Sequence, residues 1–200
     1  YDIKIKKMLS LEESLKILKE TSALVEGHFI LSSGLHSPQY VQCAKLLSKP
    51  SKAKAILFNL SEKIKNEFKD FDIILAPAMG GIVVGYEIGR LLDLETIFTE
   101  RVNGQFILRR DFFIKKNQKV LIVEDVITTG KSSLECADLV KNFGGVLVGY
   151  ACIIDRSDEN CLIKQKIVSQ IKLKIPTYTE DNLPKELLSI KAIKPGSRNL

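Results

Sequence analysis

The sequence predicts an α/β protein with a doubly wound parallel sheet and a small hood. Apolar, strand-like runs alternate with helical segments along most of the chain, which is typical of parallel sheets covered by helices on both faces. Small and charged residues follow several of these runs, and open α/β sheets bind ligands beyond the carboxyl ends of their strands. We expect a single domain, residues 1–200, with a core at about 50–172 and a hood from about 27–45 and 175–200.

The N-terminal part predicts a helix followed by a hairpin. Ser10 and Glu13 form a capping box, and the helix that they begin is expected to continue to just before Gly27. Its apolar stripe consists of Leu11, Leu15, Leu18 and Ala23. Residues 27–43 contain two short extended segments around a turn rich in Ser, Gly and Pro, which predicts a β-hairpin. Its apolar content is low for a strand pair, so we expect it to cover a site; a plain surface hairpin is the alternative.

The core is predicted to alternate between strands and helices. Strands are expected at residues 71–76, 95–100, 120–123 and 146–154, with an edge strand at 167–173. Helices are expected at residues 50–68, 82–92 and 132–143. After the second strand, Asn103-Gly104 predicts a tight turn between two short strands. Residues 178–188 are expected to form a loop and a short helix.

The stretch from Val120 to Ser132 predicts a phosphate-binding turn. A buried strand passes through a short loop into a helix, and the N–H groups at a helix N-terminus carry partial positive charge that attracts anions. Gly130 allows the backbone to approach an anion closely. Thr128, Thr129 and Ser132 add hydroxyl donors.

Two adjacent carboxylates, Glu124 and Asp125, follow the apolar strand. They would repel a phosphate, so we expect them to face sugar hydroxyls or a Mg²⁺ ion that bridges to phosphate. The stretch therefore predicts a ligand with both a phosphate and a polyol part; an ordinary strand and turn is the alternative. It is not a P-loop, because Asp125 stands where that motif requires glycine, and it lacks the GxGxxG pattern of dinucleotide-binding folds.

A second candidate anion site lies at the glycine-rich turn that ends in Gly80 and Gly81. The predicted hairpin near Asn103 carries Arg101, Arg109 and Arg110, and the planar donor fork of arginine suits polyphosphate. A solvated hairpin edge is the alternative reading of these arginines. Two glycine turns in one parallel sheet fit a ligand with two phosphate groups.

Residues 120–132 resemble the phosphoribosyl diphosphate (PRPP) motif of the type I phosphoribosyltransferases. That motif is an apolar strand, two acids, two apolar residues, Thr-Thr-Gly, and then Ser or Thr, and this chain matches it throughout. Members of the family often carry a lysine where this chain has Gly80. In this chain, backbone N–H groups would therefore bind the diphosphate. The residues that the resemblance implies for PRPP are Glu124, Asp125, Val126, Ile127, Thr128, Thr129, Gly130, Lys131, Ser132, Gly80, Gly81 and Arg101.

Residues 29–40 resemble the hood segment of orotate phosphoribosyltransferases, Phe-x-Leu-x-Ser-Gly-x-x-Ser-Pro-x-Tyr. One departure is Ser32, where many members carry a lysine that reaches the ligands. The later pair Asp155-Arg156 is similar to the Asp-Arg of the same enzymes, whose arginine binds the orotate carboxylate. The residues implied for orotate are Thr128, Arg156, Phe29, Ser33 and Gly34.

The resemblance implies that orotate and PRPP react, with Mg²⁺, to give orotidine 5′-monophosphate and diphosphate. It assigns catalysis to Glu124, Asp125 and Arg101, with no protein nucleophile. Mg²⁺ would be held mainly by PRPP and water, with Asp125 as the candidate protein contact. The family's mobile Arg-Lys-x-x-x-Lys-x-His loop has no match beyond Arg101. The resemblance also implies that this chain forms a homodimer. The alternatives are transfer to another base and a PRPP-sensing regulator on the same fold.

The composition indicates which kind of ligand the protein binds and in which cellular compartment it works. The net charge of +6 is scattered, with no cluster of basic and aromatic residues, which favours small anionic ligands over nucleic acid. The charge-free apolar run at residues 73–86 is too short to span a membrane. The four cysteines lack CxxC spacing, which favours the reducing cytoplasm. No spacing gives His28 or His36 a catalytic partner, so we interpret both histidines as structural.

Overall fold

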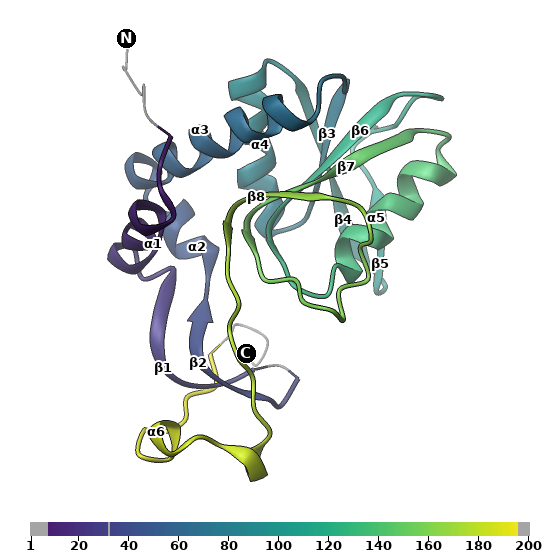
Figure 1. Ribbon diagram of the computed structural model, residues 1–200. Coiled ribbons are helices and arrows are strands. Elements are labelled where there is room, and N and C mark those ends of the chain that lie inside the picture. The colour runs from purple at the N-terminus through teal and green to yellow at the C-terminus, as the bar shows by residue number, and fades with distance from the viewer. Residues whose placement is uncertain (1–7, 32, 196–200) are drawn as a thin grey trace.

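A six-stranded sheet forms the centre of the computed structural model, which describes residues 8–31 and 33–195 (Figure 1). Its strand order is β5-β4-β3-β6-β7-β8, and every neighbouring pair is parallel except β4 with β5. The strands are β3 (Ile73–Pro77), β4 (Glu95–Val102), β5 (Gln105–Leu108), β6 (Lys119–Ile127), β7 (Val146–Asp155) and β8 (Ile167–Lys172). The predicted mainly parallel sheet is confirmed.

Helices cover both faces of this sheet, as a doubly wound fold requires (Figure 1). One face packs against α3 (Pro50–Glu67) and α4 (Gly80–Leu92), with α1 (Leu11–Glu20) and α2 (Cys43–Leu47) beside them. The other face packs against α5 (Lys131–Asn142). Alternate residues of β6 enter the two cores: Leu121 and Val123 join the first, Val120 and Ile122 the second. Burial on both faces explains why these strands are almost continuously apolar.

Four predicted boundaries were wrong. The first helix ends at Glu20, where the Thr21 hydroxyl donates to the carbonyl of Ile17 at 2.8 Å, so Ala23 lies outside it. Strand β6 continues past Val123 to Ile127, because β7 still pairs with it there. Helices α4 and α5 begin at Gly80 and Lys131, two residues and one residue before the predicted starts.

The hood is built from two separate parts of the chain. Strands β1 (Leu24–Ile30) and β2 (His36–Val41) form the predicted antiparallel hairpin. The C-terminal segment, with η1 (Glu180–Asn182) and α6 (Lys185–Leu188), runs beside the hairpin (Figure 1). It is joined to the hairpin by bridges from Phe29 to Ile193 and from His36 to Tyr178. Ser32, where the family often has lysine, and residues 196–200 of the expected hood lie outside the described residues.

The two histidines connect these parts of the hood. His28 and His36 are only 5% and 6% exposed, and His28 Nε2 lies 2.6 Å from His36 Nδ1. His28 Nδ1 lies 2.9 Å from the carbonyl oxygen of Ile190. A carbonyl can only accept, so His28 Nδ1 carries the hydrogen, and neutral His28 accepts at Nε2 from His36. The two histidines are therefore hydrogen-bond partners of each other. Their spacing in the sequence did not reveal this pairing.

Within the described ranges, no helix has both the length and the apolar character needed to cross a membrane. All four cysteines are buried and free. Cys136 and Cys152 pack in the core beneath α5, which agrees with their interpretation as small apolar core residues.

Candidate functional site

The candidate site is a cavity of about 430 Å³ at the carboxyl end of β6. It is lined by Gly80, by every residue from Glu124 to Ser132, and by Pro77, Ala78, Phe106 and Ser133. These residues come from the ends of β3 and β6, the starts of α4 and α5, and strand β5. The structure thus gathers both predicted glycine turns around one hollow.

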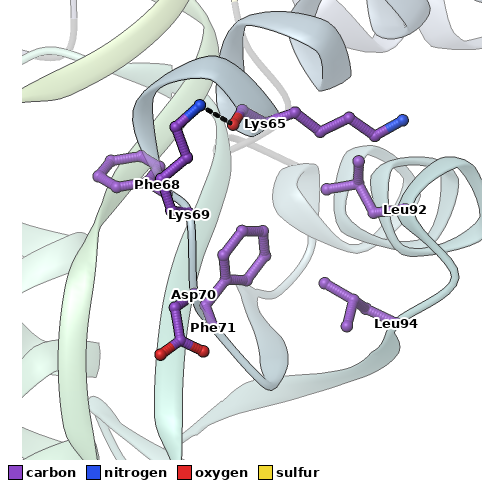
Figure 2. A pocket seen from close by; sticks show the side chains of 7 residues that line it. All are labelled: Lys65, Phe68, Lys69, Asp70, Phe71, Leu92 and Leu94. Atoms are coloured by element: carbon purple, nitrogen blue, oxygen red, sulfur yellow. Dashed lines mark hydrogen bonds between the residues drawn. The ribbon is translucent and has the colours of Figure 1, made fainter.

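A second, smaller cavity of about 240 Å³ lies at the opposite end of the parallel strands, where β3 and β4 begin (Figure 2). Its lining comes from the end of α3, the end of α4 and the segments just before β3 and β4. Phe71 and Leu94 lie within it, and the Lys69 ammonium donates to the Lys65 carbonyl at its rim (Figure 2). Because open α/β sheets bind ligands at the carboxyl ends of their strands, the cavity at β6 is the better candidate.

Strand geometry sends the two adjacent acids to opposite faces of the sheet. Glu124 continues the row of Val120 and Ile122 on the α5 side, and it is 8% exposed. Asp125 points to the α4 side, where its carboxylate lies against Gly80, the first residue of that helix. Both acids nevertheless line the same cavity, because they stand at the rim of the sheet.

Burial controls the ionisation of both acids. Burial, and then the negative charge of Asp125, raises the pKa of Glu124 from 4.5 to about 8. Burial also raises the pKa of Asp125, against the effect of the Val126 N–H, which donates to its carboxylate at 2.9 Å. This raised pKa favours the protonated form of Glu124 at neutral pH.

The Asp125 carboxylate lies directly against Gly80. A Cβ atom at residue 80 would stand 2.5 Å from Asp125 Oδ2. Gly81 is buried just below, where a Cβ would lie 3.0 Å from the Val123 carbonyl oxygen. The Ala78-Met79 peptide bond before these glycines is cis. The start of α4 and the end of β6 are thereby in direct contact.

The loop after β6 ends in a left-handed glycine. Gly130 has φ +75° and is the N-cap of α5, and its side-chain-free backbone provides no capping group. Its carbonyl accepts the first helical hydrogen bond, from the Leu134 N–H at 2.9 Å. The N–H groups of the first turn of a helix have no acceptor within the helix. The Lys131 N–H lies 3.5 Å from the Thr129 hydroxyl, and Thr128 and Thr129 are both exposed, so the loop can bind a phosphate.

A family model for the phosphoribosyl transferase domain matches residues 42–179. The chain belongs to the phosphoribosyl transferase family. It is 43% identical over 190 residues to a protein from Parvibaculum lavamentivorans named orotate phosphoribosyltransferase, in an alignment covering 94% of this chain and 98% of that protein.

Solved structures of phosphoribosyltransferases share the fold. The orotate phosphoribosyltransferase from Aeropyrum pernix has a TM-score of 0.69 at 24% identity, over 80% of this chain and 93% of that one. An adenine phosphoribosyltransferase from Thermoanaerobacter pseudethanolicus has a TM-score of 0.58 at 19% identity, over 68% of this chain and 88% of that one. Because enzymes named for different bases have this fold, the fold alone does not select a base.

Arg101, expected from the family resemblance to act on PRPP, does not line the cavity. Its guanidinium lies 4.0 Å from the ring centre of Phe106, which does line it. Its Nη2 forms an ion pair at 2.8 Å with Glu135 of α5, and its Nη1 donates to the Gly104 carbonyl. Arg109 and Arg110 both pair with Glu100. The hairpin arginines are thus held by carboxylates in the ligand-free protein.

Arg156 lies directly behind the loop that follows β6. Its backbone N–H donates to the Ile127 carbonyl at 2.8 Å, and Asp155 holds the turn by accepting from the Ser157 N–H at 2.8 Å. The side chain is half-buried, and its Nε has no partner among the described residues. Burial lowers the pKa of Arg156, and the nearby Tyr40 of β2 acts in the opposite direction.

The remaining predicted residues lie in the hood. Phe29 is buried, and its ring centre is 5.7 Å from that of Tyr40. Ser33 and Gly34 are exposed at the hairpin tip, where Gly34 has φ +85°. Tyr40 was matched as part of the hood pattern, but sequence reasoning did not place it at the site. Phe106 and Ser133 were missed as well, because an isolated Phe in a hairpin and a Ser after a motif carry no distinctive sequence pattern.

The raised pKa of Glu124 predicts a pH-dependent stability difference between the parent chain and Glu124→Gln. Between about pH 4.5 and pH 8 the unfolded carboxyl loses its proton while the folded one keeps it, so Glu124 destabilises the parent progressively as pH rises through this window. Glu124→Gln should match the parent near pH 4.5 and exceed its free energy of unfolding near pH 8. Urea unfolding at a series of pH values measures this. Exposed Glu159→Gln is the control, and parallel pH curves for Glu124→Gln and the parent would contradict the assignment.

Proposed function

We propose that this chain transfers the 5-phosphoribosyl group from PRPP to orotate, giving orotidine 5′-monophosphate and diphosphate in pyrimidine biosynthesis. The observation that carries the choice of base is Arg156, a half-buried residue whose buried Nε has no partner among the described residues and whose backbone is bonded to the phosphate loop. A planar guanidinium in that position suits a carboxylate on a planar ring. The 43% identity to the relative named orotate phosphoribosyltransferase supports the same choice.

The loop from Val126 to Ser132 would hold the 5′-phosphate. It ends at the N-terminus of α5, whose N–H groups and dipole favour an anion. The hydroxyls of Thr128, Thr129 and Ser132 can donate to phosphate oxygens, and exposed Lys131 adds positive charge. Gly130 has the left-handed backbone that joins this loop to the start of α5.

Glu124 and Asp125 would hold the ribose hydroxyls, directly or through water. With a pKa of about 8, Glu124 can both donate one hydrogen bond to a hydroxyl oxygen and accept another at neutral pH. Asp125 faces the start of α4, and when it is ionised it can accept hydrogen bonds but cannot donate them. Two different acids at the cavity rim can therefore fix the orientation of a sugar ring between the phosphate loop and α4.

Departure of diphosphate builds negative charge that the protein must stabilise. The N–H groups at Gly80 and Gly81 begin α4, and Arg101 lies behind Phe106 at the same cavity. Arg101 would have to leave Glu135 to reach this charge. No protein nucleophile is needed, because the base attacks the anomeric carbon.

Mg²⁺ is the cofactor that we propose, and the residues fit it. The Asp125 carboxylate at the cavity offers the oxygen donor that Mg²⁺ prefers, and the described residues contain no group of three or more His, Cys, Asp or Glu able to hold a metal by themselves. The ion would therefore be held mainly by PRPP and water, with Asp125 in reach. When bound, it neutralises charge on the diphosphate.

Orotate would bind between the core and the hood. Arg156 would take its carboxylate, and Thr128 on the adjoining loop would donate to the ring. Phe29 and Tyr40 bring aromatic surface from the hood toward Arg156, while Ser33 and Gly34 lie at the hairpin tip. We also propose that residues 1–200 act as one unit, because the hood and the core share this site. Four free cysteines support a cytoplasmic location.

We further propose a homodimer. Helix α4 exposes an apolar row of Met79, Val83 and Tyr86, with Met79 85% exposed. These residues are spaced along one helical face, and such a patch is typical of a protein–protein interface. A second copy of the chain is the partner. Sedimentation equilibrium should give twice the chain mass at micromolar concentration, and a monomer would contradict the proposal.

A panel of bases tests the proposed activity. Diphosphate release from PRPP with Mg²⁺ is measured with orotate, adenine, hypoxanthine and uracil in turn. We expect release with orotate alone. Release with a purine instead would support the other-base alternative, and tight PRPP binding without release would support a regulator.

Arg156→Ala should raise the KM for orotate by at least about tenfold and leave the KM for PRPP nearly unchanged, because it removes one charged hydrogen-bond partner of the base. Steady-state kinetics with each substrate varied in turn measures both constants. Arg90→Ala, which removes an exposed arginine from α4, is the matched control and should alter neither KM. An unchanged KM for orotate in Arg156→Ala would reject this assignment.

A further inference from the structure

The segment after β7 braces the phosphate loop from behind. Residues 156–163 leave the strand with Arg156, whose N–H bonds to the Ile127 carbonyl, and return so that the Leu162 N–H donates to the Thr129 carbonyl at 2.9 Å. These two hydrogen bonds hold the loop near both of its ends. They use backbone atoms, so no residue type in the sequence indicates them.

Side-chain packing gives the loop a third contact with this segment, at Gly130. Gly130 lies so close to this segment that a Cβ atom there would stand 2.7 Å from Ile163 Cγ1 and 3.4 Å from the Cys161 sulfur. Ile163 and Cys161 are only 6% and 5% exposed, and they join Ile127 in the core beneath α5. The Cα of Gly130 is thus pressed against a rigid apolar surface.

The position of Gly130 decides where α5 points its first N–H groups. Gly130 is the N-cap of that helix and has a left-handed backbone, which offers no side chain of its own for packing. Whatever limits its movement must come from another part of the chain. Ile163 provides this limit from outside the cavity, whose lining does not include it.

We propose that Ile163 is a positioning residue for the phosphate end of the phosphoribosyl substrate. It acts through Gly130 and touches no substrate. This inference rests on the proposed function for the identity of the substrate. Because Ile163 lies against Gly130 and packs in the core beneath α5, loss of its side chain should weaken binding of the phosphate end and spare binding of the base.

Ribose 5-phosphate is the direct probe, because it carries the phosphate and the sugar without diphosphate or base. Calorimetric titration of Ile163→Ala should give a Kd about tenfold weaker than that of the parent, since small displacements of positioning groups have large effects. The KM for PRPP should rise by a similar factor, while kcat and the KM for orotate stay within about twofold. Ile163→Val, which keeps most of the packing, should fall between the two, about two- to threefold weaker than the parent.

Ile73→Ala is the matched control. Ile73 is a fully buried isoleucine of the same core, but it lies at the start of β3, at the other end of the sheet from the loop. It should lower the melting temperature as Ile163→Ala does and leave the Kd for ribose 5-phosphate unchanged.

Three results would overturn the proposal: an unchanged Kd in Ile163→Ala, an equal loss in Ile73→Ala, or, if Ile163→Ala does not fold, an unchanged Kd in Ile163→Val. A parent chain that binds ribose 5-phosphate but does not use orotate would reject the proposed function alone. In that case the effect of Ile163 on binding would still stand.

Discussion

The contact between the Asp125 carboxylate and the backbone of Gly80 is the constraint on which the candidate site depends. It joins the carboxyl end of β6 to the first residue of α4, at a distance that leaves no room for a Cβ atom. Asp125 can reach this position because β6 stays in the sheet beyond the apolar core, paired with β7 as far as Ile127. The same pairing sends Glu124 to the other face, toward α5. One extended strand therefore places two acids, a glycine turn and a helix N-terminus around a single cavity.

The rest of the fold connects this cavity to the hood and to Arg156, where we propose that the base binds. The hood hairpin leads directly into α2, whose Cys43 thiol lies 3.8 Å from the Asp125 carbonyl oxygen. Tyr40, at the end of the hairpin, is close enough to Arg156 to affect its pKa. The C-terminal segment closes the hood through its bridges to Phe29 and His36 and through the buried histidine pair. Segments distant in sequence thus meet where a flat, charged base would have to lie next to a sugar phosphate.

The sequence predicted the sheet, the hairpin and the order of elements because these follow from local apolar periodicity and turn residues. It also predicted the cavity lining from Glu124 to Ser132, since a continuous motif folds as one turn. It could not predict that Glu124 and Asp125 face opposite sides, because this depends on how far β7 pairs with β6. Nor did it reveal the His28–His36 pair, the Arg101–Glu135 ion pair or the packing of Ile163 on Gly130. Each of these joins side chains or backbone from distant segments, and neither partner has an unusual local pattern.

The most direct test of the contact that organises the site is the activity of Gly80→Ala. The new Cβ would meet the end of the Asp125 side chain, which can turn aside at little cost to the fold, so the carboxylate should move while the protein stays folded. We expect kcat/KM for diphosphate release from PRPP with orotate to fall by at least about tenfold, with an unchanged circular dichroism spectrum and melting temperature. Gly104→Ala, at the tip of the β4–β5 hairpin, where a Cβ would meet nothing, controls for the loss of a glycine. A Gly80→Ala variant with the kcat/KM of the parent would show that the site does not depend on this contact.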